Sequence, residues 1–191
     1  MTLERYNEKE DRAQRSSTHV SRSHCKSTNG NKRTPLLFVI QKYKARKLHY
    51  DLRLEVEGVL KSWTLPKGPS LDPQVKRLAV EVDDHPLSYK NFEGRSREGV
   101  YGEGEVIVWD AGTYEVSGGE VTMRKGIREG RLTFVLRGKK VHGTYSMVRF
   151  QGKRQWLIRK RQDKYASLAD PTLDYRSVIS SRTLPDLHPT K

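Results

Sequence analysis

The chain has 191 residues, with 37 Lys and Arg against 23 Asp and Glu, and a formal net charge of +14. Apolar residues make up only 34% of it. This length fits one domain with terminal extensions and argues against two full domains. The positive charge favours a polyanionic partner, with nucleic acid ahead of an anionic membrane.

Membrane insertion and disulfide chemistry find no support in the sequence. No stretch approaches the roughly 20 apolar residues of a membrane-spanning helix, and the first residues contain no apolar signal-peptide segment. The single cysteine, Cys25, excludes an internal disulfide and a cysteine-based zinc site. We therefore expect a cytoplasmic, nucleoid-associated monomer with no membrane partner.

Polar segments flank the central part of the chain. Residues 1–34 have few large apolar side chains and are rich in Ser, Thr, Lys and Arg. Such a segment cannot bury enough apolar surface to offset the entropy lost on ordering, so we expect a basic, largely flexible N-terminal arm. Residues 166–191 are again polar and contain prolines, which predicts a loosely packed C-terminal tail. The folded domain is expected over 35–165.

The central region alternates apolar and polar residues in eight or so short runs, separated by turns that contain glycine. This pattern predicts a mainly β fold, either an antiparallel barrel or a sandwich. No long amphipathic helix interrupts the runs, which disfavours a parallel α/β fold. The three tryptophans lie inside apolar runs and are expected in the core. The predicted strands are 37–43, 48–56, 59–65, 77–83, 105–110, 112–116, 131–137, 143–150 and 155–161.

The most informative motif is His49-x-Asp51-x-Arg53, in the second of these runs. Residues two apart in a strand point to one face, with Cα atoms roughly 6.5 to 7 Å apart. An imidazole and a carboxylate are ligands for a divalent transition metal, and an adjacent Arg binds phosphate oxygens in bidentate fashion. The alternative is a solvent-facing polar strand face, which antiparallel sheets often have.

Three further residues are candidates for the same site. His85 follows a strand in VDDHPLSY, four residues before Tyr89. Lys67 lies in the turn PKGP, and Arg77 begins the run RLAVEV. Each of them alone is better explained as an ordinary turn or surface residue. The segment YGEGEV is followed by no helix pattern, so it does not predict a phosphate-binding loop.

Five segments of the central region carry a more specific pattern. They read FVIQKYKARKLHYDLRLEVEGVLKSWTLPKGPS, KRLAVEVDDHPLSYKNFEG, GVYGEGEVIVWDAGTYE, LTFVLRGKKVHGTYSMVRF and QWLIRK. In this order, from about residue 35 to about residue 165, they resemble the 3'-phosphoesterase module of bacterial DNA ligase D. The resemblance implies a small β-barrel with minor flanking helices. It also implies an activity, dependent on manganese or another divalent metal, that removes a 3'-terminal ribonucleoside and then a 3'-phosphate to leave a 3'-OH.

By position, the resemblance also implies roles for individual residues. His49 and Asp51 would be metal ligands, and Arg53 and His85 would contact the scissile phosphate. In the mechanism that we favour, His85 protonates the leaving oxygen or holds the phosphate. The implied catalytic residues are His49, Asp51, Arg53, His85 and Tyr89, and the implied phosphate- or DNA-binding residues are Gln41, Arg53, Lys67, Arg77 and His85.

Departures from the family pattern bear on activity. Tyr43 stands where the family has a third metal ligand, a His, and a phenol ionises near pH 10, so it is a poor ligand at neutral pH. Asp83 is shorter than the acidic residue expected there. In the N-terminal segment Glu10 and Asp11 replace a basic-acidic pair, and Ser17 stands where a Glu is expected.

These observations leave three functional hypotheses. The first is a metal-dependent DNA 3'-end-processing enzyme of non-homologous end joining, favoured by the retained His49, Asp51 and Arg53. The second is a catalytically weak or inactive DNA-end-binding module of the same fold, acting with a ligase or Ku and needing no metal, favoured by Tyr43. The third is a general nucleic-acid-binding barrel. Residues 1–34 and 160–191 together hold +6 of the net charge and the residues between them +8, and we expect much of the latter around the His49, Asp51 and Arg53 face.

Overall fold

The computed structural model describes residues 35–96, 104–116 and 119–187. The predictions for the N-terminal arm, for Cys25 and for the altered segment that includes Ser17 lie outside these residues. Within them, no helix is both long enough and apolar enough to cross a bilayer.

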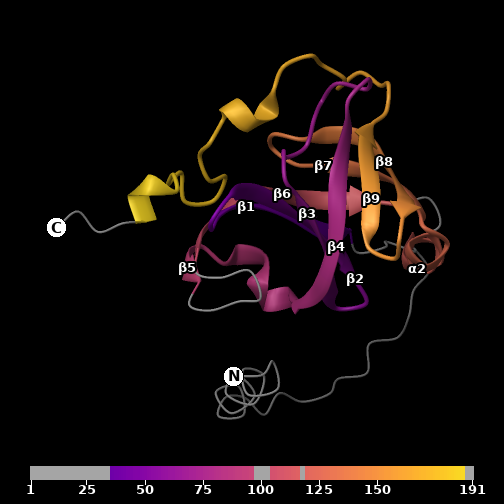
Figure 1. Ribbon diagram of the computed structural model, residues 1–191, viewed down its shortest axis with the longest axis horizontal. Coiled ribbons are helices and arrows are strands. Elements are labelled where there is room, and N and C mark those ends of the chain that lie inside the picture. The colour runs from indigo at the N-terminus through magenta and orange to yellow at the C-terminus, as the bar shows by residue number, and fades with distance from the viewer. Residues whose placement is uncertain (1–34, 97–103, 117–118, 188–191) are drawn as a thin grey trace, which may run out of the picture. The chain divides into compact units, whose positions relative to one another are not determined.

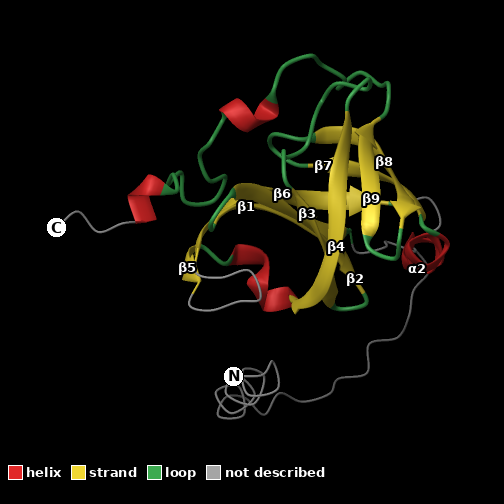
Figure 2. Cartoon of the chain, viewed as in Figure 1, coloured by secondary structure: helices red, strands yellow, loops and turns green. Residues whose placement is uncertain are grey.

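Eight antiparallel strands close into a barrel (Figures 1 and 2). The neighbour order is β1-β2-β3-β4-β9-β8-β7-β6, and pairing of β6 with β1 completes the ring. This closure decides between the two predicted architectures in favour of the barrel. A short strand, β5, pairs with β6 at one end. The strands are β1 (Leu36–Lys44), β2 (Leu48–Val56), β3 (Val59–Leu65), β4 (Lys76–Pro86), β5 (Gly94–Ser96), β6 (Gly104–Glu115), β7 (Arg131–Arg137), β8 (His142–Gln151) and β9 (Gln155–Lys160).

The barrel interior is filled by one face of each strand, as the alternating pattern predicts. All three tryptophans are completely buried, which confirms that they belong to the core. The rings of Trp63 and Trp156 meet edge to face at 5.9 Å between centroids, a favourable aromatic geometry. The opposite face of β1, β2 and β3 is therefore the outside of the barrel, and it carries the His49, Asp51 and Arg53 motif.

Two parts of the sequence fold differently from the prediction. The runs 105–110 and 112–116 form one strand, β6, because Gly112 is not a break. A Cβ at this position would collide with the backbone of Arg137, so the glycine allows β6 to lie close to the end of strand β7. One α-helix, α2 (Gly119–Glu129), lies where only turns were expected. Of its described side chains only Met123 is fully buried, and Ile127 packs against the core.

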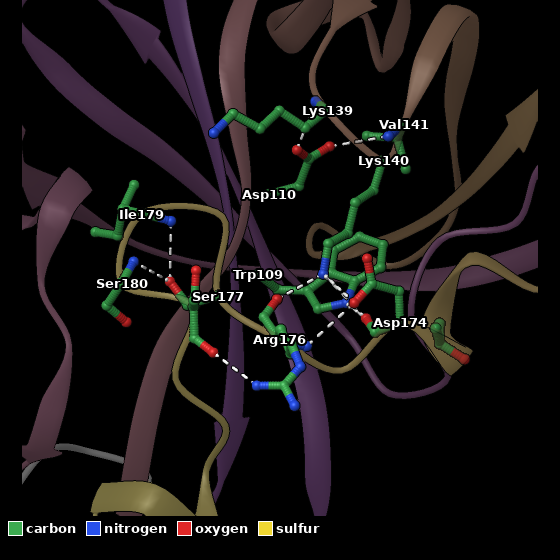
Figure 3. Close-up of polar contacts among 12 residues, drawn as sticks. Trp109, Asp110, Lys139, Lys140, Val141, Asp174, Arg176, Ser177, Ile179 and Ser180 are labelled. Carbon is green, nitrogen blue, oxygen red and sulfur yellow. Dashed lines mark hydrogen bonds and ion pairs between the residues drawn. The ribbon is translucent and has the colours of Figure 1, made fainter.

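The polar C-terminal segment follows the surface of the barrel and is hydrogen bonded to it. The backbone N–H of Val178 donates to Val108 O at 2.9 Å, and Trp109 Nε1 donates to Asp174 O at 2.5 Å. Lys140 Nζ donates to the backbone oxygens of Asp174 and Arg176, and its ammonium group lies 4.9 Å from the Trp109 ring centroid (Figure 3). Polar composition thus did not prevent this segment from packing. It also contains two 3-10 turns, η2 (Pro171–Leu173) and η3 (Pro185–Leu187).

Candidate functional site

The candidate site lies on the outer face of β1, β2 and β3. In the register of these strands, Asp51 is directly opposite Gln41 on one side and Thr64 on the other, and Arg53 is opposite Ser62. Directly paired residues of an antiparallel sheet project from the same face. The pairing therefore gathers these five polar side chains, which we call the Arg53 cluster.

Arg53 is held at three nitrogen atoms. Its Nε donates to Gln41 Oε1 at 2.7 Å, its Nη1 to Ser62 Oγ at 2.8 Å, and its Nη2 to Asp51 Oδ2 at 3.1 Å. Only 3% of Arg53 and 7% of Asp51 is exposed, so the alternative of a solvent-facing polar strand is wrong for these two residues. A guanidinium fixed in this way presents its charge in one orientation, which suits recognition of an oxyanion.

Residues 85–92 cover this face of the sheet. They include the 3-10 turn η1 (Leu87–Asn91). Gln41 is fully buried, and its Nε2 donates to the backbone oxygens of Tyr89 and Phe92, each at 3.1 Å. The Tyr89 ring stacks on Phe92 at 4.8 Å and lies 5.2 Å from the Arg53 guanidinium. Both ends of the Gln41 amide are thus used inside the protein, so its geometry favours a positioning role over the predicted contact with DNA.

His49 and Asp51 form the pair predicted to bind a metal. The distance from His49 Nε2 to Asp51 Oδ1 is 4.0 Å, and Thr64 Oγ1 donates to the same carboxylate oxygen at 2.7 Å. His49 Nδ1 lies 3.1 Å from Lys47 O. When Nδ1 carries the proton and donates it there, Nε2 faces Asp51 with its lone pair, as a metal ligand must.

Tyr43 lies beside this pair, as its position in the sequence predicts. It is directly opposite His49 in the β1–β2 register, and the two rings stack with centroids 4.9 Å apart. Within the described ranges, no three His, Cys, Asp or Glu side chains are placed to hold a metal together. The imidazole and carboxylate present therefore fit a divalent ion only if water or substrate oxygens supply its remaining ligands.

His85 lies against Tyr89, with ring centroids 5.1 Å apart, and its Nδ1 is 3.0 Å from Asp83 O. Burial, and then the positive charge of Arg53, lower the pKa of His85 to about 4, although the hydrogen bond to Asp83 opposes this shift. The imidazole is therefore neutral at pH 7. It can accept a hydrogen bond as it stands, but it can donate a proton only after an anion has raised its pKa.

Lys67 and Arg77 are not joined to the Arg53 cluster by any hydrogen bond or ion pair between described residues. Lys67 is exposed in the turn after β3. Arg77 lies eight positions before His85 along β4, its Nε is buried without a hydrogen-bond partner, and its charge contributes to the lowered pKa of Asp170. Their predicted roles in phosphate binding stay predictions.

Ser62, Thr64 and Glu93 are part of the arrangement but were not predicted. The first two could have been found, because a two-residue turn at Glu57-Gly58 fixes the register that places them opposite Arg53 and Asp51. Glu93 gives no such signal. Its carboxylate accepts from Val108 N at 2.8 Å and from Arg182 Nη2 at 3.3 Å, and so links the residues after η1 to the C-terminal segment.

The ionisation of Glu93 is supported from several sides. Burial opposes the charge, but hydrogen bonds from the hydroxyls of Ser177 and Ser180, from the Val108 backbone and from Arg182 outweigh it and lower the pKa of Glu93. Glu93 follows Phe92, whose carbonyl accepts from Gln41. The C-terminal segment is thereby connected to the cover over the Arg53 cluster.

Comparisons with known proteins relate this chain to one family. Residues 41–149 match the family model described as the DNA Ligase D 3'-phosphoesterase domain. A multifunctional non-homologous end joining protein LigD from Pseudomonas aeruginosa is 47% identical over 160 residues, which are 80% of this chain and 19% of that protein. A multifunctional non-homologous end joining DNA repair protein LigD from Mycobacterium tuberculosis is 40% identical over 127 residues, which are 66% of this chain and 16% of that protein.

The chain thus spans less than a fifth of the length of these relatives. The match covers the strands that carry Gln41, Asp51, Arg53 and Thr64, together with the η1 cover. It confirms the resemblance carried by the sequence segments. The chain belongs to the DNA ligase D 3'-phosphoesterase domain family.

Proposed function

We propose that this chain hydrolyses phosphate esters at DNA 3' ends during non-homologous end joining. In this proposal a 3'-terminal ribonucleoside and then a 3'-phosphate are removed, and the product is the 3'-OH that a DNA ligase requires. The observation that carries the proposal is Arg53, whose guanidinium is fixed by Gln41, Ser62 and Asp51 beside the His49 and Asp51 pair. Family membership supplies the phosphoesterase chemistry, and the net charge of +14 suits a DNA substrate.

His49 and Asp51 would hold the divalent metal, for which manganese is our proposal. When bound, such an ion polarises a phosphoryl oxygen and lowers the pKa of a coordinated water. Thr64 orients the Asp51 carboxylate through its hydrogen bond of 2.7 Å, and the Lys47 carbonyl orients the His49 ring through its contact of 3.1 Å. A side chain locked in this way loses little further entropy on binding.

Arg53 would stabilise the charge that develops on the phosphoryl oxygens, because its orientation is set before the substrate arrives. His85 would first bind the phosphate. A phosphate oxyanion next to His85 raises the pKa that burial and Arg53 now hold at about 4, so proton uptake accompanies binding. The imidazolium that results can then donate a proton to the leaving oxygen.

A specific observation favours a second candidate function. The phenol of Tyr43 packs on His49, at the position where the family pattern has a further imidazole ligand. With two metal-binding side chains instead of three, the chain would bind a DNA 3' end and cleave it weakly or not at all. Such a module would act with a separate ligase or Ku protein.

One experiment separates the two functions. A labelled primer-template with a single 3'-ribonucleotide, or with a 3'-phosphate, is incubated with the protein with and without manganese. The enzyme hypothesis predicts turnover that requires the metal and is lost in Asp51→Asn. Glu115→Gln removes an equal charge from the surface pair with Arg137 and serves as the matched control. Tight binding without turnover, at protein in excess over substrate, would refute the enzyme and support the binding module.

A further inference from the structure

The outer face that carries the Arg53 cluster continues onto other strands. Thr64 on β3 is directly opposite Val80 on β4, and Val80 is opposite Gln155 on β9. The row that starts at Gln41 and Asp51 thus runs across β3 and β4 to β9 without changing face. Figure 1 shows β4 and β9 side by side, and the register joins β8 to β9. We call the outward positions of β4, β9 and β8, together with Arg131 on the neighbouring strand β7, the extension face.

The centre of the extension face is apolar and accessible. Leu78 on β4 is opposite Leu157 on β9, which is opposite Val148 on β8. Leu78 is 39% exposed and Val148 43% exposed, and Phe150, at the register shift that interrupts the β8–β9 pairing, is also exposed. Adjacent exposed apolar side chains on a regular sheet are typical of a surface that binds a ligand or another macromolecule.

Basic residues surround this apolar centre. Lys76 on β4 is directly opposite Arg159 on β9, and Arg131 on β7 is opposite Val148. Like charges in directly opposed positions of a sheet destabilise it. Of the described residues at the outward positions from 76 to 80, 131 to 133, 146 to 150 and 155 to 159, none is Asp or Glu.

The basic residues of the extension face differ from other basic residues of the barrel in their ion pairing. Arg124, Arg137 and Arg154 are each paired with a carboxylate, at 2.9, 3.1 and 3.2 Å. Within the part of the chain that the structure describes, Lys76, Arg131 and Arg159 have no carboxylate within ion-pair distance. A like-charge pair without a counter-charge is complementary to an anionic ligand.

We propose that the extension face binds the DNA strand that leads to the 3' end held at the Arg53 cluster. This inference rests on the proposed function, because it extends the same site. Lys76, Arg159 and Arg131 contact phosphates, while sugar and base surfaces pack on Leu78, Leu157, Val148 and Phe150. Phosphate charge together with apolar and aromatic packing is the usual combination in sequence-independent binding of single strands.

The geometry sets a length for the bound strand. Neighbouring strands of a sheet lie about 4.8 Å apart, so the five steps from β2 to β7, which carries Arg131, cover about 24 Å along the sheet. At about 3.4 Å per nucleotide of one strand, this distance corresponds to about seven nucleotides. We therefore expect affinity to increase with strand length up to about seven nucleotides and then to level off.

The test measures binding of fluorescent single strands of two, four, six and twelve nucleotides, each ending in a 3'-phosphate, by anisotropy without metal. The test variant combines Lys76→Gln, Arg131→Gln and Arg159→Gln. The control variant combines Arg124→Gln, Arg137→Gln and Arg154→Gln, which removes the same charge from the paired positions. Thermal melting of both variants verifies that the barrel is folded.

In the test variant we expect the affinity for the twelve-nucleotide strand to fall at least tenfold more than in the control. The slope of log affinity against log salt should fall by about 2, because each contact to a single strand contributes about 0.7. The dinucleotide should bind both variants equally. An equal decrease in the two variants would show an effect of net charge alone and would overturn the proposal. Unchanged binding at every length would also overturn it, and an acidic protein would then be the partner to examine.

Because these measurements use no metal and require no cleavage, they separate this inference from the proposed function. If cleavage fails while binding still depends on length and on the extension face, the inference stands and the enzyme hypothesis falls. If cleavage succeeds and the test variant binds like the control, the enzyme hypothesis stands and this inference falls.

Discussion

Gln41 gives the sharpest prediction, because its buried amide connects strand β1 to Arg53 and to residues 85–92, which cover the Arg53 cluster. Replacing it in Gln41→Leu leaves the Arg53 Nε–H without its acceptor at 2.7 Å and the Phe92 carbonyl without its donor at 3.1 Å. The Tyr89 carbonyl retains the Phe92 N–H at 3.1 Å. Loss of a bond to a charged donor costs about 1.5 to 3 kcal/mol, and an unsatisfied buried carbonyl about 1 to 3 kcal/mol.

Leucine recovers part of this through its apolar surface, so we expect a net loss of about 3 kcal/mol in the free energy of unfolding. Urea denaturation followed by tryptophan fluorescence measures it, because all three tryptophans are buried in the core. Gln151→Leu, at an exposed position on β8, is the control and should change stability by less than about 0.5 kcal/mol. A loss below about 1 kcal/mol in Gln41→Leu would refute the reasoning.

Gln41→Glu separates geometry from charge in the same position. The introduced carboxylate still accepts from Arg53, but it faces the Tyr89 and Phe92 carbonyls without a proton to donate. The folded state therefore raises the pKa of the new group and binds more protons than the unfolded state. Stability relative to the parent should consequently recover as the pH falls through that raised value. A stability difference that is independent of pH would contradict this account of the contacts.

Three further predictions concern the residues around the cluster. Folding lowers the pKa of His85 from 6.5 to about 4, so as the pH falls the unfolded chain binds a proton at this imidazole before the folded protein does. Stability should therefore fall as the pH drops from 6.5 towards 4. The decrease should be about 1 to 2 kcal/mol after allowance for solvent contact, and urea denaturation of His85→Asn should show a flatter pH profile; an unchanged profile would contradict the stated burial. Tyr43→His should strengthen manganese binding at least tenfold by isothermal titration calorimetry, and an unchanged affinity would show that position 43 does not reach the metal. Glu93→Gln should lower stability by about 1 to 2 kcal/mol and increase amide exchange over residues 177–182, whereas parental exchange would show that Glu93 does not hold the C-terminal segment.

The strands and the motif could be predicted because both depend on local alternation. A period of two over residues 48–56 places His49, Asp51 and Arg53 on one face whatever the rest of the chain does. The hairpin turn at Glu57-Gly58 contains the further information that Thr64 opposes Asp51. This part of the site is thus encoded within about twenty residues.

The burial of that face could not be predicted in the same way. Its cover comes from residues 85–92, and Gln41 bonds to Tyr89 and Phe92 across 48 and 51 positions of the chain. Helix α2 was not predicted from the sequence for a related reason, because so short a helix is stabilised mainly by packing on the barrel. Contacts between distant segments decide both features, and periodicity does not report them.

Strand β1 closes the barrel, and this has a consequence for the order of folding. Its pairing with β2 is local, but Leu36 pairs with Tyr114 of β6, far along the chain. Closing so long a loop is entropically costly and therefore slow. Gln41 lies on this strand, between Asp51 of β2 on one side and Val108 of β6 on the other, so its strand is held on both sides only when the ring is closed. A nascent chain that has not yet emerged from the ribosome as far as residue 115 can pair β1 with β2 but cannot close the barrel, so the Arg53 cluster reaches its final packing together with the finished fold.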